Sequence, residues 1–241
     1  MLSLYHYEPS ANSMKPLLCL AEKELEYESH YVDLHNFEQH SAEFVAINPN
    51  GQVPVLIHDG AVINESTVIN EYLDEVFPEV KLVPEDPVER AQMRIWSKFV
   101  DEYFCPALSK IGWSFLIPKI AARLKAGELE EALKKIPLEE QRQKWLTAAT
   151  ESFTEEELAE SRRQVTVSIE RMEGLLAERN WLAGKKYSLA DVNSYSMVFR
   201  IPQLVSEAMS EEKTPLAMAW LEKMNARPAV QAALATSRQN T

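Results

Sequence analysis

Arginine is absent from the first 78 residues of this chain, and lysine occurs there only as Lys15 and Lys23. The same stretch contains thirteen Asp and Glu residues, so it carries −11 of the protein's formal charge of −12. Binding to nucleic acid depends on cations that neutralise phosphates, so we expect no nucleic-acid partner. An anionic ligand of this region must be held by local groups, which are helix N-termini, backbone N–H groups, Lys15 and the five histidines, all of them before residue 59.

Long apolar runs are also absent. No segment approaches the ~20 apolar residues of a membrane span, and the first residues, MLSLYHYEPS, lack the basic start and apolar core of a signal peptide. We therefore expect a cytoplasmic protein with no membrane partner. The two cysteines, Cys19 and Cys105, form no CxxC motif and no metal-ligand cluster, so no metal site is predicted. Cys19 lies in an apolar helical stretch and is expected to be core.

A proline-rich segment, PEVKLVPEDP at residues 78–87, divides the 241 residues into two parts. Residues 1–80 are predicted to form an α/β domain and residues 88–241 an all-helical domain, because strand-like alternation of any length occurs only in the first part. In the second part, the predicted helix 89–104 continues after a kink at Pro106 and breaks again near Pro118. A capping box at Ser188-Leu189-Ala190-Asp191 is expected to start a buried helix and is assigned no chemistry.

The first part shows strand and helix patterns in a fixed order. The expected elements are a strand over 2–7, a helix over 14–23, a strand over 27–34, a helical turn capped by Ser41, strands over 53–58 and 61–63, and a helix from Glu65-Ser66. Asp59-Gly60 makes the tight turn between the last two strands. Tyr5 and Tyr7 are expected to pack on the first strand.

Two dipeptides at this spacing, Val53-Pro54 and Glu65-Ser66, resemble the glutathione-binding half of glutathione transferases, which is a thioredoxin-like domain. The resemblance implies a cis bond before Pro54, with the backbone of Val53 turned outward to pair with the tripeptide glutathione like an added strand. It implies that Ser66, expected at the helix N-cap, receives the γ-glutamyl carboxylate. Glu65 would then hold the neighbouring ammonium.

The glycine end of glutathione is expected at Gln39 and His40, and Gln52 is expected to reach the peptide. The thiol would lie at the start of the first helix, where Ser10, Asn12 and Ser13 are the candidate activators. Lowering the thiol pKa by ~2 units requires ~2.7 kcal/mol, which one hydrogen bond to the thiolate and the helix N-terminus can supply. Ser13, expected immediately before the helix, is favoured over Ser10, and Asn12 is third.

The electrophile is expected to bind between the helices of the second domain. An aromatic and aliphatic cluster surrounds the two predicted helix breaks, and its members are Tyr103, Ile111, Trp113, Phe115 and Ile117. Breaks next to aromatic rings can leave a slot for a flat substrate, although such residues can also be simple core.

Five longer sequence segments resemble one particular group within this superfamily. FEQHSAEFVAINPNGQVPVLIHDG, ESTVINEYLDEVFPE, DEYFCPALSKIGW, YSLADV and NARPA together resemble the bacterial lignin β-aryl-etherases of the glutathione transferase superfamily. The implied reaction is attack of glutathione thiolate on the carbon that bears an aryl ether, next to a ketone, with loss of a phenol. The family resemblance also implies a homodimer.

Two alternatives stay open at this point. The same fold could serve another electrophile, by aromatic dehalogenation, isomerisation or general conjugation; the stretch from Ser10 to Lys15 also resembles reductive dehalogenases, which have Cys where Asn12 stands. A non-catalytic binding module is the third reading. The retained Val53-Pro54, Glu65-Ser66 and first-helix hydroxyls argue against it.

Overall fold

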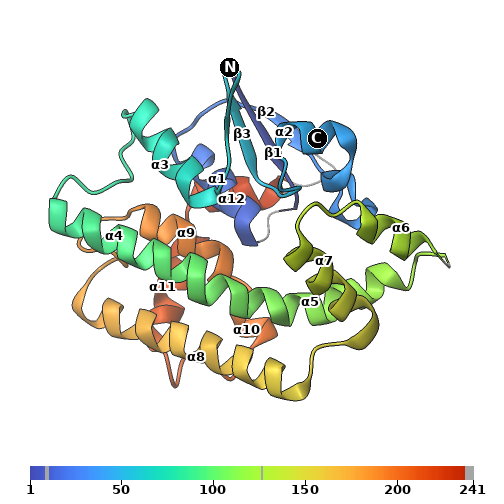
Figure 1. Cartoon of the computed structure of the whole chain (residues 1–241). Coiled ribbons are helices and arrows are strands. Elements are labelled where there is room, and N and C mark those ends of the chain that lie inside the picture. The colour runs from blue at the N-terminus through green and yellow to red at the C-terminus, as the bar shows by residue number, and fades with distance from the viewer. Residues whose placement is uncertain (9–10, 126, 237–241) are drawn as a thin grey trace.

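The computed structural model describes residues 1–8, 11–125 and 127–236 (Figure 1). In the first domain, a four-stranded sheet has the order β2-β1-β3-β4, with β1 parallel to β2 and antiparallel to β3. Its elements are β1 (Leu2–His6), α1 (Ala11–Glu22), β2 (Glu28–Tyr31), η1 (Leu34–Asn36), η2 (Glu38–His40), α2 (Ala42–Ile47), β3 (Val55–His58), β4 (Ala61–Ile63) and α3 (Ser66–Val76). The predicted order is confirmed, and so is the cis peptide bond between Val53 and Pro54.

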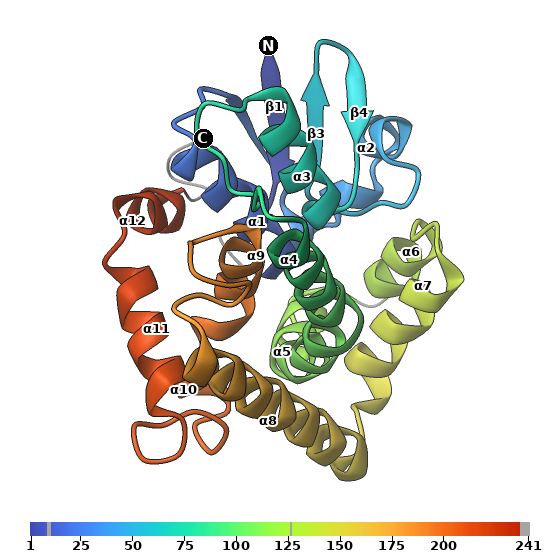
Figure 2. The same cartoon turned by 90° about the vertical axis from the view of Figure 1, so that its left-hand side faces the viewer.

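The second domain is built of helices joined by loops, with no named strand among its described residues, and lies beneath the sheet in Figures 1 and 2. Its elements are α4 (Pro87–Phe99), η3 (Val100–Phe104), α5 (Cys105–Ala121), α6 (Glu128–Lys134), α7 (Glu139–Leu146), η4 (Thr147–Glu151), α8 (Glu155–Glu178), α9 (Leu189–Val198), α10 (Ile201–Leu204), α11 (Pro215–Asn225) and α12 (Pro228–Ala235). The fold class, a thioredoxin-like domain followed by a helical domain, is as predicted.

The predicted helix breaks at Pro106 and Pro118 are wrong. One wide π-helical stretch, η3, joins α4 to α5, and Pro106 falls in the first turn of α5. Proline lacks an N–H and its ring crowds the carbonyl four residues earlier, and the wider π turn just before Pro106 provides the room. Pro118 lies inside α5, which ends only at Ala121.

One apolar core runs through both domains. Leu4 and Leu56 pair across β1 and β3, and both are fully buried together with Leu17 of α1 and Val192 of α9. α1 contacts both α3 and α9, so the first helix is the layer that the two domains share. Contacts with both domains therefore fix the position of the first turn of α1, which carries the predicted site residues Asn12 and Ser13.

The capping box predicted at Ser188 is confirmed. The Ser188 hydroxyl accepts from the backbone N–H of Ala190, and the Asp191 carboxylate accepts from the backbone N–H of Ser188. Asp191 also accepts hydrogen bonds from the backbone of Leu182 and from the indole of Trp220. All of this is buried, so these residues stabilise the fold and lie outside the functional site.

Candidate functional site

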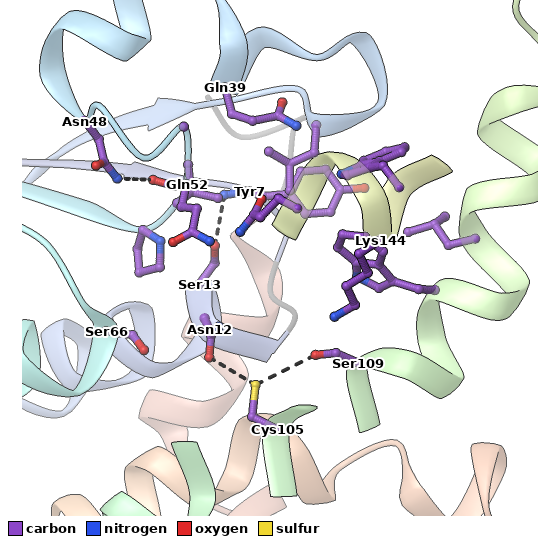
Figure 3. Close-up of a pocket in the computed structure, with 18 of the residues that line it drawn as sticks. Tyr7, Asn12, Ser13, Gln39, Asn48, Gln52, Ser66, Cys105, Ser109 and Lys144 are labelled. Atoms are coloured by element: carbon purple, nitrogen blue, oxygen red, sulfur yellow. Dashed lines mark hydrogen bonds between the residues drawn. The ribbon is translucent and has the colours of Figure 1, made fainter. Parts of the chain in front are cut away.

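A cavity of about 430 Å³ lies between the first domain and the helices α5 and α7 (Figure 3). Eight of the residues predicted to bind or activate glutathione line it: Asn12, Ser13, Gln39, Gln52, Val53, Pro54, Glu65 and Ser66. Trp113 and Ile117 line it from α5. Ser10 lies outside the described residues. The cavity therefore has a first-domain wall and a helical wall.

Ser13 lies in the first turn of α1, as the third residue of the helix, and not before it as predicted. It is buried, and its Oγ accepts a hydrogen bond from the backbone N–H of Tyr7 at 3.2 Å. A hydroxyl that accepts from one side can still donate its proton from the other. The Ser13 hydroxyl is thus held in place in the cavity with a donor to offer to a ligand atom.

Asn12 links the two walls. Its Oδ1 accepts from the thiol of Cys105 at 3.6 Å, and the Cys105 sulfur lies 3.8 Å from the hydroxyl of Ser109 (Figure 3). Cys105 and Ser109 belong to α5 and are one helical turn apart, so both face the cavity. Neither residue is among the predicted site residues, because a single cysteine before a proline forms no recognisable motif.

The start of α3 differs from the prediction by one residue. Glu65 is the N-cap and Ser66 is the first residue of the helix. Glu65 has a left-handed backbone conformation, with φ of 66°, which is uncommon for a residue with a side chain and is found preferentially at functional sites. The free N–H groups of α3 start here, at the cavity, so this corner favours an anion.

Gln39 and His40 are both buried, but only Gln39 lines the cavity. His40 lies behind it, with its Nε2 3.3 Å from the Gln39 amide nitrogen. A Cβ on Gly51 would lie 2.6 Å from His40 Nδ1, so only glycine fits there. Burial lowers the pKa of His40 to about 4, so the imidazole is neutral at pH 7. His40 is thus a support for Gln39.

Val53 and Gln52 form the strand-like edge of the cavity. The backbone N–H and C=O of Val53 have no hydrogen-bond partner among the residues that the structure describes. The carbonyl of Gln52 accepts from the side chain of Asn48 at 2.8 Å, which fixes the loop in front of β3. An extended peptide could pair with this open edge.

The helical wall only partly matches the prediction. Trp113 and Ile117 line the cavity, but Tyr103, Ile111 and Phe115 do not. Tyr103 stacks on Phe99, with ring centroids 5.2 Å apart, Ile111 is core, and Phe115 is half-exposed on the outer face of α5. Because α5 is continuous, helical periodicity sends the side chains of Ile111 and Phe115 away from the face that Trp113 and Ile117 share.

Lys144 and Trp145 of α7 complete the helical wall and were missed in the sequence. The ring of Trp145 contacts Trp113 at 5.4 Å and Phe37 of the first domain at 4.9 Å between centroids. Lys144 places its ammonium 4.4 Å from the centre of the Trp113 ring. Nothing in the sequence around Lys144-Trp145, a charged helical segment, indicates a binding site. The pair reaches the cavity only because the fold packs α7 against α5.

Two first-domain groups also differ from expectation. Tyr7, expected to pack on the strand, follows β1, lines the cavity and bonds His35 through its hydroxyl at 3.0 Å. Burial raises the pKa of Tyr7, so the phenol stays protonated at neutral pH. Lys15 does not line the cavity: it is fully buried and paired with Asp101 at 2.5 Å. It is therefore unavailable to an anionic ligand.

The described residues contain no group of three or more His, Cys, Asp or Glu side chains that could hold a metal ion. Within the same residues, no helix combines the length and the apolar character that crossing a membrane requires.

Comparisons with known proteins agree with this geometry. The chain is 47% identical to protein LigF of Sphingobium sp. strain SYK-6 over 235 residues, which cover 95% of this chain and 91% of LigF. The crystal structure of that protein, described as the beta-etherase LigF, superposes with a TM-score of 0.92 over 96% of this chain and 98% of the other. A probable glutathione S-transferase of Nicotiana tabacum, parC, is 28% identical over 94% of this chain and 86% of its own.

Family comparison identifies both domains. Residues 1–75 match the glutathione S-transferase N-terminal domain, and residues 104–228 match the corresponding C-terminal domain. The structure of glutathione transferase F7 from Populus trichocarpa, 23% identical, shares the fold with a TM-score of 0.75 over 98% of this chain and 100% of the other. The chain belongs to the glutathione S-transferase family.

Proposed function

We propose that this chain is a glutathione-dependent β-aryl etherase, which uses glutathione thiolate to cleave the aryl ether of lignin-derived α-keto aromatics. The observation that carries the proposal is the near full-length identity to LigF, whose structure is described as that of a beta-etherase. The cavity supports it, because a wall suited to a peptide faces a wall with two indole rings.

The polar groups of the first-domain wall fit glutathione independently of the similarity to LigF. Gln39 Oε1 and Asn64 Oδ1 are buried at the cavity without a hydrogen-bond partner among the described residues, and an unpartnered buried oxygen is costly unless a ligand satisfies it. The open backbone of Val53 would pair with the peptide. The N-terminus of α3 at Ser66 would take the γ-glutamyl carboxylate, with Glu65 beside the ammonium.

The thiol would lie at the start of α1. The Ser13 hydroxyl would donate to the sulfur and favour its thiolate form, because hydrogen bonding to the charged form lowers a pKa. Asn12 is the second candidate among the described residues, and its amide nitrogen is its available donor. No side-chain base is needed, since the thiol loses its proton to water.

The reaction then exchanges one bond for another. The S–C bond forms while the C–O bond to the aryl group breaks, and the electron pair leaves with the aryl oxygen as a phenolate. The neighbouring ketone activates the carbon, and the protein orients the two reactants in the cavity, where proximity accounts for much of the acceleration. Trp113 and Ile117 would contact the aromatic rings.

The test is incubation with glutathione and an α-keto β-aryl ether that carries a fluorescent phenol. We expect release of the phenol that requires glutathione, and a glutathione thioether as the second product by mass spectrometry. Tight glutathione binding without any phenol release would contradict the etherase and favour another electrophile, such as a halogenated aromatic. Failure to bind immobilised glutathione would favour a non-catalytic module.

We further propose a cytoplasmic homodimer. Four exposed apolar side chains lie on α3 and α4, where we expect two subunits to pack; they are Val68, Val76, Val88 and Ile95. Burying such a patch stabilises an association. Light scattering coupled to gel filtration should give twice the chain mass, and Val68→Glu with Ile95→Glu should give the monomer.

A further inference from the structure

Lys144 is the cation of the helical wall. Its side chain is half-buried, points into the cavity and approaches Ser109 in Figure 3. Its titratable neighbours among the described residues are Cys105 and Lys110, and no described carboxylate forms an ion pair with it. The ammonium thus has an indole face, that of Trp113, and no counter-charge from the part of the chain that the structure describes.

Two other lysines with buried ammonium groups each have a carboxylate partner. Lys15 is paired with Asp101 at 2.5 Å, and Lys23 with Asp74 at 3.0 Å. An ammonium that loses water without gaining an anion is costly, and such a group in a cleft is typical of a functional site. An anionic partner for Lys144 is therefore expected to arrive with a ligand.

The position of Lys144 indicates which part of the ligand this is. The carboxylates of glutathione would lie at the start of α3 and beside Gln39, and Figure 3 shows the Lys144 ammonium directed away from Gln39, toward Ser109. Its electrostatic neighbour Cys105 in turn contacts Asn12, at the start of α1. The ammonium thus belongs to the side of the cavity where the thiolate would meet the electrophile.

We propose that Lys144 is a catalytic residue that donates a hydrogen bond to the aryl oxygen as it leaves, and so stabilises the phenolate. This inference rests on the proposed etherase function. As the S–C bond forms and the C–O bond breaks, the negative charge passes from sulfur to the aryl oxygen, and the phenolate then takes a proton from water. No oxidant or reductant is involved.

Two features suit Lys144 to this task. Burial lowers the pKa of Lys144, which makes its N–H a more acidic and hence stronger donor while the group stays cationic. Trp113 supplies a flat surface next to the ammonium, so an aromatic ring stacked there would bring its oxygen close to the charge. A donor placed where charge develops stabilises the transition state more than the bound substrate.

The experiment uses a series of α-keto β-aryl ethers that differ only in the leaving phenol, from nitrophenol, a good leaving group, to methoxyphenol, a poor one. We expect Lys144→Met to lower kcat/KM little for the nitrophenyl ether and ~10- to 100-fold for the methoxyphenyl ether. Lys144→Arg, which keeps a cation, should recover most of that loss. The matched control is Lys134→Met: Lys134 of the neighbouring helix α6 is paired with Glu130 and Glu131 and lies outside the cavity. The dependence of kcat/KM on the leaving group in this variant should equal that of the unmodified protein.

Equal losses across the whole series would overturn the role of Lys144, because a structural defect does not sense the leaving group. A rise in KM for glutathione alone would overturn it too, and would place the ammonium at a carboxylate of the tripeptide. If the unmodified protein releases no phenol from any ether, the etherase function fails, and the role of Lys144 fails with it. The first two results require an active unmodified protein, so the two failures are distinguishable.

Discussion

The two walls of the cavity present polar groups in different ways. The first-domain wall uses helix N-termini, open backbone and short neutral side chains such as Ser13 and Gln39, fixed by contacts close in sequence. The helical wall uses large rings and a single lysine, brought together from α5 and α7. The first-domain wall suits a peptide ligand that is always the same. The side chains of the helical wall can be replaced to fit a different electrophile without disturbing the first-domain wall.

The largest effect is expected where the two walls touch. Trp145→Ala removes the indole that contacts both Phe37 and Trp113, in a small core separate from the main one. We expect a loss of about 3–5 kcal/mol of stability in this layer. Hydrogen exchange of α6 and α7 measures it, because local opening is seen directly.

The control is Phe115→Ala on the exposed face of α5, which should change stability by no more than about 0.5 kcal/mol. Equal protection of the α7 amides from hydrogen exchange in both variants would show that Trp145 does not hold the two walls together.

On the first-domain wall, Ser13→Ala should raise the pKa of the bound glutathione thiol by about 1–2 units, because a charge-assisted hydrogen bond is lost. Turnover at neutral pH should fall roughly 10- to 100-fold, while glutathione still binds. Titration of thiolate absorbance gives the pKa. An unchanged titration in Ser13→Ala, with a shifted one in Asn12→Ala, would assign the donor to Asn12.

Gln39→Leu should have a smaller effect. Removing the amide takes away a hydrogen bond worth about 1 kcal/mol to the peptide, so KM for glutathione should rise about fivefold with kcat unchanged. Steady-state kinetics with varied glutathione measures both. A fall in kcat with unchanged KM would mean that Gln39 acts on the reacting atoms and not on the peptide.

The smallest effect concerns His40 and pH. Its pKa is about 4 in the folded protein against an ordinary 6.5, so between these values the unfolded chain binds more protons. Stability should therefore fall as pH drops from 6.5 to 4, by on the order of 1 kcal/mol for this residue. Denaturant unfolding at several pH values measures it.

In His40→Gln the slope of stability against pH should become shallower but not vanish, because burial also lowers the pKa of His6. A slope as steep as that of the unmodified protein would show that His40 carries no part of it.

The first-domain wall was largely predictable because its signals are local. The Asp59-Gly60 turn, the N-cap Ser41 and the dipeptides Val53-Pro54 and Glu65-Ser66 each fix the backbone within a few residues. Some of the errors there are shifts of one to three residues at helix starts, as at Ser13 and Ser66. Such shifts arise because several short polar side chains in a row can each cap a helix.

The helical wall was predicted poorly because the expected breaks at Pro106 and Pro118 do not occur. A π-helical stretch before Pro106 leads directly from α4 into α5, and within α5, which continues past Pro118, the side chains follow one helical phase. Trp113 and Ile117 share the cavity face in that phase, whereas Phe115 points outward.

The amino-acid sequence by itself determined the order of strands and helices in the first domain, the helical class of the second and the capping box at Ser188, because hydrophobic periodicity and turn chemistry act over short distances. Only the tertiary structure decided which residues of the helical domain face the first. Lys144 and Cys105 are 39 positions apart, and packing of α7 against α5 brings both to the cavity. The electrostatic environment that isolates the Lys144 ammonium exists only after the helices pack, since it depends on which carboxylates are absent from its surroundings.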